Sequence, residues 1–223
     1  MTKYLIFDAG PIISMTMNGL LPILEKLRKD FDGQFIITPE VKRELVDKPL
    51  KIKKYELEAL EVQNLIGRGI LKLSTDIIPH NLLEKETLKI MDIANSAFFA
   101  EGKITLIQKG EASCLAFAKL CNSPNVIVID ERTTRLLVES PKNLQEIMQK
   151  KLHTRIRINF GNLKHLGAFK FIRSAELLYI AYKKQLFEIK DSNLLDALLY
   201  AVKFKGTANS TQEIEEIKNI ARR

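Results

Sequence analysis

Short apolar runs and longer stretches with helical spacing alternate along the start of the chain. Residues 3–7 and 34–38 ("QFIIT") each predict a buried strand, because each is a continuous apolar run that ends at a turn or cap signal. The apolar positions in residues 12–27 predict two short helices divided near Asn18 and Gly19. Such alternation is typical of a parallel sheet with covering helices.

The helix after the second strand has a clear start signal. Thr38 is its predicted N-cap, Pro39 takes the first helical position, and Glu40 adds an acid to the first turn. The helix continues through "EVKRELVDK", so the first 48 residues are predicted to form strand, helix, strand and helix.

The rest of the chain is predicted to be mainly helical, with three more strands. Residues 125–130 ("NVIVID") give the clearest strand pattern and residues 70–74 a shorter one, while 154–160 ("TRIRINF") alternate as an edge strand does. Helices are predicted at residues 50–66, 81–100, 110–121, 131–138, 142–151, 172–186, 191–204 and 211–221.

We therefore expect one α/β domain with a helical C-terminal extension. The α/β core spans residues 1–150 and contains a helical insertion at about 50–105. Residues 151–223 form a mainly helical part packed on the same domain. A chain of 223 residues can bury roughly 70% of its unfolded surface, which is enough for a substantial core.

Composition and charge narrow the class of protein. Hydrophobic residues make up 46% and charged residues 28%, as in soluble globular proteins, and no window approaches the ~20 apolar residues of a membrane span. The first apolar run is interrupted by Asp8, unlike a signal peptide, and Cys114 and Cys121 share one helical pattern as core thiols do. We expect a cytoplasmic protein without a membrane partner. The net charge of +8 favours a polyanionic partner such as nucleic acid.

Acidic residues stand where the predicted strands end. Asp8 follows the first strand, and Asp130 ends the strand at 125–130. Ligands of open parallel sheets bind beyond the carboxyl ends of the strands, so the two aspartates are expected to meet. Glu44 borders the inward stripe of its helix, and Glu111 opens the helix before the last strand.

Four converging carboxylates would repel one another and have raised pKa values unless a cation compensated them. Mg²⁺ takes one or two carboxylates together with water and phosphate oxygens. Two such ions about 4 Å apart activate a water and stabilise the leaving oxygen in phosphodiester cleavage. An acidic pocket in a basic chain therefore fits a polyanion that is cut at metal ions.

Each acid also has a purely structural explanation, which stays open at this point. Asp8 fits a turn or helix cap, and Asp130 fits a cap of the following helix. Glu111 is favourable at a helix N-terminus because of the helix dipole, and Glu44 fits a solvated face.

Four segments in this order, "YLIFDAGPII", "IITPEVKREL", "KGEASCLAFA" and "VIVIDERTTRLL", resemble the PIN-domain family of metal-dependent, VapC-like ribonucleases. The resemblance covers about residues 3–140, and more loosely "FIRSAELLYIAYKKQLF". It implies a doubly wound parallel sheet flanked by helices, Mg²⁺ or Mn²⁺ as cofactor, and single-stranded or structured RNA as substrate. The family's acids fall on these residues: Asp8, Glu44, Glu111 and Asp130, with Glu131 as a fifth candidate ligand.

The chain departs from the family pattern at two places. Gly10 stands where many members have Ser or Thr, so a hydroxyl contact to metal or water is missing. Residues 50–105 and the C-terminal part make the chain longer than the compact toxins of the family.

Six basic residues are candidate contacts to nucleic acid: Arg132, Arg135, Lys150, Lys151, Arg155 and Arg157. The last four form a strip that fits either a phosphate backbone or a solvated sheet edge. The first two follow Asp130 directly, and Arg135 equally fits a pair with a carboxylate.

The leading hypothesis is a metal-dependent endoribonuclease that uses a metal-activated water and forms no covalent intermediate. A non-catalytic RNA-binding or assembly protein of the PIN fold is one alternative, and a toxin inhibited by an antitoxin protein is another. A homodimer is left open. The chain has no phosphate-binding loop and no dinucleotide-binding glycine motif, and its three histidines fit no ligand spacing.

Overall fold

A five-stranded, all-parallel sheet forms the centre of the structure, a computed structural model that describes residues 1–100, 104–204 and 211–221. Its strand order is β3-β2-β1-β5-β7. The strands are β1 (Tyr4–Phe7), β2 (Gln34–Ile37), β3 (Leu71–Leu73), β5 (Asn125–Val128) and β7 (Phe171–Ile172). The order runs outward from β1 in one direction and from β5 in the other, so the switch point lies between these two strands.

Strand β1 is central because it pairs with neighbours on both sides. Ile6 lies opposite Ile36 of β2 and Ile127 of β5, and all three side chains are fully buried. Burial on both faces explains why these strands are apolar runs rather than alternating patterns.

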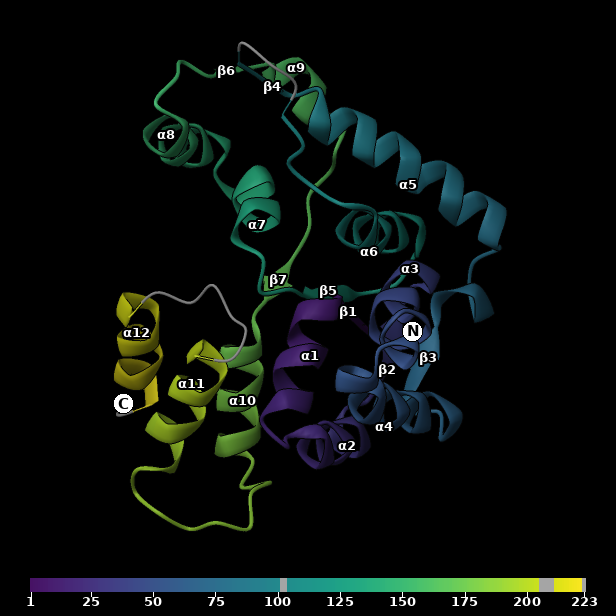
Figure 1. Cartoon of the computed structure of the whole chain (residues 1–223), viewed down its shortest axis with the longest axis vertical. Helices are drawn as coiled ribbons and strands as arrows, with labels where there is room; N and C mark the ends of the chain where they lie inside the picture. Colours follow the sequence, from purple (N-terminus) through teal and green to yellow (C-terminus); the bar gives the residue numbers. More distant parts are fainter. Residues whose placement is uncertain (101–103, 205–210, 222–223) are drawn as a thin grey trace.

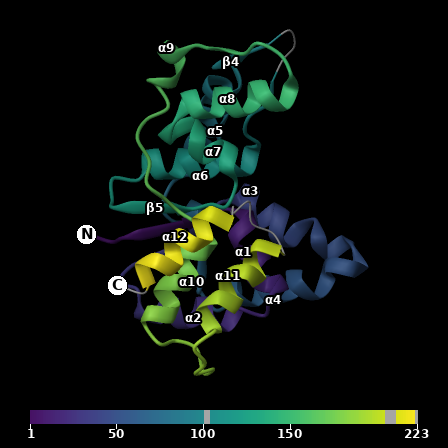
Figure 2. The same cartoon turned by 90° about the vertical axis from the view of Figure 1, so that its left-hand side faces the viewer.

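Helices cover both faces of the sheet (Figures 1 and 2). One layer contains α5 (His80–Asn95), α6 (Lys109–Leu120), α7 (Arg132–Glu139) and α8 (Pro141–Leu152). The other contains α1 (Ala9–Met17), α2 (Leu21–Asp30), α4 (Glu56–Gly67), α10 (Ser174–Lys183), α11 (Leu194–Phe204) and α12 (Thr211–Ala221). The expected α/β class, with a parallel sheet flanked by helices, is confirmed.

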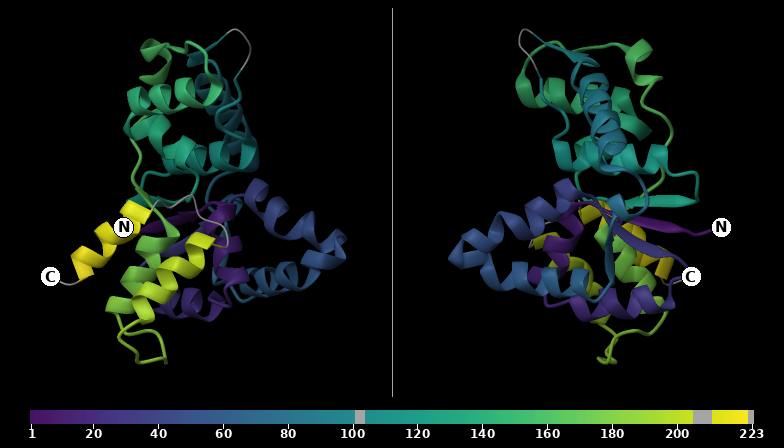
Figure 3. Two further views of the ribbon diagram at one scale, coloured as in Figure 1. Left: turned by 60° about the vertical axis from the view of Figure 1, so that its left-hand side comes forward. Right: turned by 90° about the vertical axis from the view of Figure 1, so that its right-hand side faces the viewer.

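The helix after β2 is irregular where the sequence predicts one continuous helix. A single turn of α-helix, α3 (Pro39–Lys42), continues as a π-helical turn, η1 (Arg43–Asp47), in which the Lys48 N–H donates to the Arg43 carbonyl at 3.0 Å. Pro49 has no N–H to extend the ladder, which explains the end of this segment. Two short 3₁₀ turns, η2 (Pro49–Lys51) and η3 (Lys53–Tyr55), then lead to α4, and the segment from α3 to α4 projects from the body of the molecule (Figure 3).

Two predictions in the C-terminal part are wrong in detail. The predicted helix at 172–186 is observed as α10 at Ser174–Lys183, and the two residues Phe171 and Ile172 form an unpredicted fifth strand, β7, that pairs with β5. The predicted edge strand at 154–160 is only β6 (Arg157–Ile158), which pairs with β4 (Phe98–Phe99) outside the main sheet. Strands of two residues depend on distant pairing, which periodicity alone does not reveal.

The remaining short elements connect these layers. The turn η4 (Ser74–Asp76) follows β3, and α9 (Phe160–Leu163) follows β6. Both cysteines are free thiols, Cys114 buried and Cys121 half-buried. In the described part of the chain, no helix has the length and apolar character that crossing a membrane requires.

Candidate functional site

One pocket of about 350 Å³ at the carboxyl ends of β1 and β5 gathers every acid that the sequence predicts for the site. Its acidic lining residues are Asp8, Glu44, Glu111, Asp130 and Glu131. They come from four separate segments: the ends of β1 and β5, the π-helical turn η1 and the start of α6. The pocket lies at the switch point of the sheet, where α/β proteins bind ligands.

Asp8 is both the N-cap of α1 and a buried wall of the pocket. Its Oδ2 accepts a hydrogen bond from the Gly10 N–H at 3.4 Å, so its capping role is real. The side chain is nevertheless placed in a poorly solvated position, and burial together with the charge of Glu111 raises the pKa of Asp8 to about 7. The carboxyl is therefore only partly ionised near neutral pH.

Asp130 does not cap the helix that follows it. Its Oδ1 accepts a hydrogen bond from the Ser174 N–H at 2.8 Å, which ties the end of β5 to the start of α10. Burial raises the pKa of Asp130 to about 6, although this hydrogen bond and the charges of Arg135 and Arg173 oppose the rise. Its second oxygen, Oδ2, is buried and has no hydrogen-bond partner within the described residues.

Glu44 reaches the pocket from the π-helical turn and lies directly against Gly110. A Cβ on Gly110 would stand 2.9 Å from Glu44 Oε1, so any side chain there would displace the Glu44 carboxylate from its present position. Burial raises the pKa of Glu44, while the charges of Lys48 and Arg43 lower it. Such π-helical turns re-aim side chains and are frequent at functional sites.

Glu111 and Glu131 each serve a helix terminus as well as the pocket. Glu111 accepts a hydrogen bond from the Gln108 N–H at the start of α6, and Glu131 accepts one from the Thr134 N–H at the start of α7. Glu131, rather than Asp130, is thus the N-cap of α7. Burial, with smaller contributions from the charges of Glu131 and Glu44, raises the pKa of Glu111.

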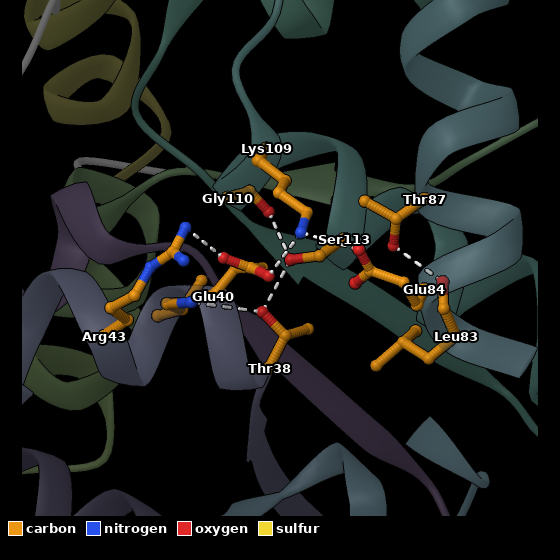
Figure 4. A network of polar contacts seen from close by, with 10 residues as sticks. Thr38, Glu40, Arg43, Leu83, Glu84, Thr87, Lys109, Gly110 and Ser113 are labelled. Carbon is orange, nitrogen blue, oxygen red and sulfur yellow. Dashed lines mark hydrogen bonds and ion pairs between the residues drawn. The ribbon is translucent and has the colours of Figure 1, made fainter. Parts of the chain in front are cut away.

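A chain of hydroxyl groups fastens the segment that carries Glu44 to the helix that carries Glu111 (Figure 4). The Val41 N–H donates to Thr38 Oγ1, and Ser113 Oγ donates to the Gly110 carbonyl at 2.6 Å. A hydroxyl group has one proton, and Ser113 already donates its proton to the Gly110 carbonyl. In the 2.6 Å contact between Thr38 Oγ1 and Ser113 Oγ, Thr38 is therefore the donor and Ser113 the acceptor. Both side chains are buried, which makes the link hard to replace by water.

Ion pairs reinforce the same junction from outside the pocket (Figure 4). Lys109 Nζ lies 2.9 Å from Glu40 and 2.7 Å from Glu84, which joins α6 to both α3 and α5. Arg43 also pairs with Glu40 at 2.5 Å. None of these residues lines the acidic pocket, so their role is to hold its walls together.

The arrangement fits a hard cation but is not a preformed metal shell. Among the residues that the structure describes, no group of three or more His, Cys, Asp or Glu side chains is arranged to hold a metal ion. Instead, Asp8, Glu111 and Glu131 each turn an oxygen to a nearby N–H. Two features are ones that a cation would relieve: the raised pKa of Asp8, and the Asp130 Oδ2, which has no hydrogen-bond partner among the described residues although the charges of Arg135 and Arg173 act on its carboxyl group.

The predicted basic contacts fall into two groups. Arg132 is exposed at the start of α7, close in sequence to the pocket, whereas the charge of Arg135 acts on Asp130. The other four residues are exposed on α8, on β6 and between them, and none lines the pocket: Lys150, Lys151, Arg155 and Arg157. This strip lies with the helical layer above the sheet in Figure 1.

Sequence reasoning missed the contribution of the start of α10. Ser174 fixes Asp130, and the buried Arg173 lies near enough for its charge to lower the pKa of that carboxyl. Both follow β7 directly, so recognising "FI" as a strand would have placed them at the same sheet edge.

Comparisons with known proteins add no assignment to this geometry. The chain matches no protein-family model, and neither the curated proteins nor the solved structures contain a significant match to it.

Proposed function

We propose that this protein is a PIN-like, divalent-metal-dependent ribonuclease that hydrolyses RNA phosphodiester bonds. One observation carries the proposal: five acids from four separate segments line a single pocket at the switch point of a parallel sheet, in a chain of net charge +8. Purely structural caps would explain individual acids, but they give no reason for all five to face one cavity.

Asp8 and Asp130 are the proposed principal ligands of Mg²⁺ or Mn²⁺, since they are the most buried acids of the pocket. Glu44, Glu111 and Glu131 would complete the shell directly or through water, as is usual for Mg²⁺. The bound ion would supply a nucleophilic water near neutral pH and a counter-charge for the scissile phosphate.

The chain's own residues position that chemistry. The Ser174 N–H holds Asp130 by its Oδ1, while Oδ2 has no hydrogen-bond partner among the described residues and is the oxygen proposed to bind the ion. The Thr38–Ser113 link fixes the distance between the segments that bear Glu44 and Glu111. Arg132, exposed at the start of α7, is the proposed contact to an RNA phosphate.

The test is cleavage of a panel of single-stranded and structured RNAs with and without Mn²⁺. We expect the wild type to cut in Mn²⁺ and to stop in chelator, and Asp8→Asn to lose activity. Asp32→Asn changes an aspartate whose side chain is 96% exposed and serves as the matched control. Equal trace activity in wild type and Asp8→Asn would show that the protein is not this enzyme.

A non-catalytic RNA-binding protein of the same fold is the second candidate. The observation in its favour is that no ready-made metal shell exists among the described residues. Calorimetric titration with Mn²⁺ separates the two, because the enzyme requires Mn²⁺ binding that Asp130→Asn weakens, whereas the alternative requires only salt-dependent RNA binding.

A further inference from the structure

A second cavity adjoins the acidic pocket and shares two lining residues with it. It has a volume of about 430 Å³ and lies between α1, the π-helical turn η1 and α4. Ile13 and Glu44 line both cavities, so the two lie side by side. Its other lining residues are Thr16, Met17, Leu45, Pro49, Lys54, Tyr55, Glu58, Ala59 and Val62.

Most of the residues that line this cavity are apolar, and one of them is the aromatic Tyr55. Ile13, Met17 and Tyr55 are 42%, 50% and 43% exposed, so apolar surface is open to a ligand rather than closed in the core. The Lys54 ammonium lies over one face of the Tyr55 ring, with its Nζ 5.2 Å from the ring centroid, which leaves the opposite face for a ligand. A cavity of this size, mostly apolar with a few polar groups, is typical of small planar ligands.

The charged residues that line the cavity are Glu44, Lys54 and Glu58, and the chain segment beside it is rich in lysine. Four lysines lie in residues 48–54, and all four are exposed: Lys48, Lys51, Lys53 and Lys54. They belong to the segment between η1 and α4, which projects from the body of the molecule (Figure 3). Lys53 pairs with Glu56 at 2.8 Å, and the charge of Lys48 lowers the pKa of Glu44, so Lys51 and Lys54 are the lysines available to an anionic ligand.

We infer that this cavity is a subsite for one unpaired base of an RNA strand whose backbone continues into the acidic pocket. The base would stack on Tyr55 against Ile13 and Met17, as bases stack on aromatic and apolar side chains in single-strand binders. Lys51 and Lys54 would contact the phosphates that flank this base. A paired base cannot enter, so the protein selects single-stranded RNA.

This inference rests on the proposed function, because RNA is the ligand that explains both cavities together. An apolar peptide would fill the cavity, but it would give the exposed Lys51 and Lys54 no partner of opposite charge. An anion alone would satisfy the lysines but not the exposed ring and side chains. An unpaired nucleotide satisfies both requirements.

The test measures binding of a fluorescent single-stranded RNA of about 10 nucleotides in chelator, where no cleavage occurs. We expect Tyr55→Ala to weaken binding about tenfold and Tyr55→Phe to retain it, since one base stack is worth about 1–3 kcal/mol. Leu57→Ala removes a neighbouring side chain that is 67% exposed and does not line the cavity, and it should bind like wild type. Lys51→Gln should reduce the salt dependence by about one phosphate contact.

Three results would overturn the inference: equal RNA affinity of Tyr55→Ala and wild type, duplex RNA bound as tightly as single-stranded RNA, or a wild type that binds no single-stranded RNA. Failure of the proposed function looks different. Binding that depends on Tyr55, without any cleavage in Mn²⁺, would support the subsite and reject the nuclease, whereas cleavage with equal affinity in Tyr55→Ala would do the reverse.

Discussion

The replacement Asp8→Asn makes the sharpest test of the electrostatics of the pocket. Asn has nearly the same shape as Asp and is an equally good N-cap, so the hydrogen bond from the Gly10 N–H can persist. What the replacement removes is a carboxyl that burial and the charge of Glu111 make costly to ionise. The variant should therefore gain stability relative to wild type wherever that carboxyl would be charged.

The magnitude follows from the pKa of Asp8, which is 3.8 in an unperturbed chain and about 7 in the folded protein. Because the folded pKa is raised, stability is full below about pH 4 and is lost as the pH rises to about 7. The difference of about 3 in pKa, at about 1.4 kcal/mol for each, gives a total loss of about 4 kcal/mol. Of this total, the free energy of unfolding loses about 1–1.5 kcal/mol between pH 6 and pH 8.

The assay is urea unfolding at pH 6 and pH 8 in chelator. We expect the difference in unfolding free energy between Asp8→Asn and wild type to grow by about 1–1.5 kcal/mol from pH 6 to pH 8. Asp32→Asn, at an exposed position, should show the same difference at both pH values. A pH-independent difference for Asp8→Asn, or one that shrinks toward pH 8, would refute the reasoning.

Three further substitutions test the walls of the pocket. Gly110→Ala should weaken Mn²⁺ binding in calorimetry with little loss of stability, because its Cβ would stand 2.9 Å from Glu44 Oε1 and displace that carboxylate; unchanged Mn²⁺ affinity would contradict this. Gly10→Ser should fold normally and bind Mn²⁺ at least as tightly, since its Cβ would meet Asp8 only at 3.7 Å; a fall in melting temperature would show that the position does not accept a side chain. Lys109→Met should lower the free energy of unfolding in urea by about 1–2 kcal/mol, because it removes an ion-pair partner of the buried Glu40. This value lies between those typical of exposed and of buried ion pairs. An unchanged unfolding midpoint would contradict the prediction.

The central strands were predictable because their signal is local. Strands β1, β2 and β5 are buried on both faces, which requires continuous apolar runs that end at cap residues. Thr38 followed by Pro39 placed the start of α3 correctly, and its hydroxyl indeed accepts a hydrogen bond from the Val41 N–H. The position of acids at strand ends followed from the same pattern.

The rest of the site was not predictable, because it depends on contacts between distant segments. Strand β7 exists through its pairing with β5, and only that pairing brings Ser174 to Asp130. The π-helical turn that aims Glu44 has no sequence signature beyond the Pro49 that ends it. Lysines near Tyr55 were visible in the sequence, but their meaning depends on a cavity that α1 and α4 form together.

No Lys or Arg lines the acidic pocket in the described part of the chain, and the contacts that join its walls lie outside it. The Thr38–Ser113 hydrogen bond joins two walls, and Lys109 joins α6 to α3 from outside. We therefore expect the protein to fold in chelator, and the proposed cation to change the pH dependence of its stability. A bound divalent ion favours the ionised form of Asp8, so Mn²⁺ should stabilise the wild type more at pH 8 than at pH 6, and should stabilise Asp8→Asn less at both.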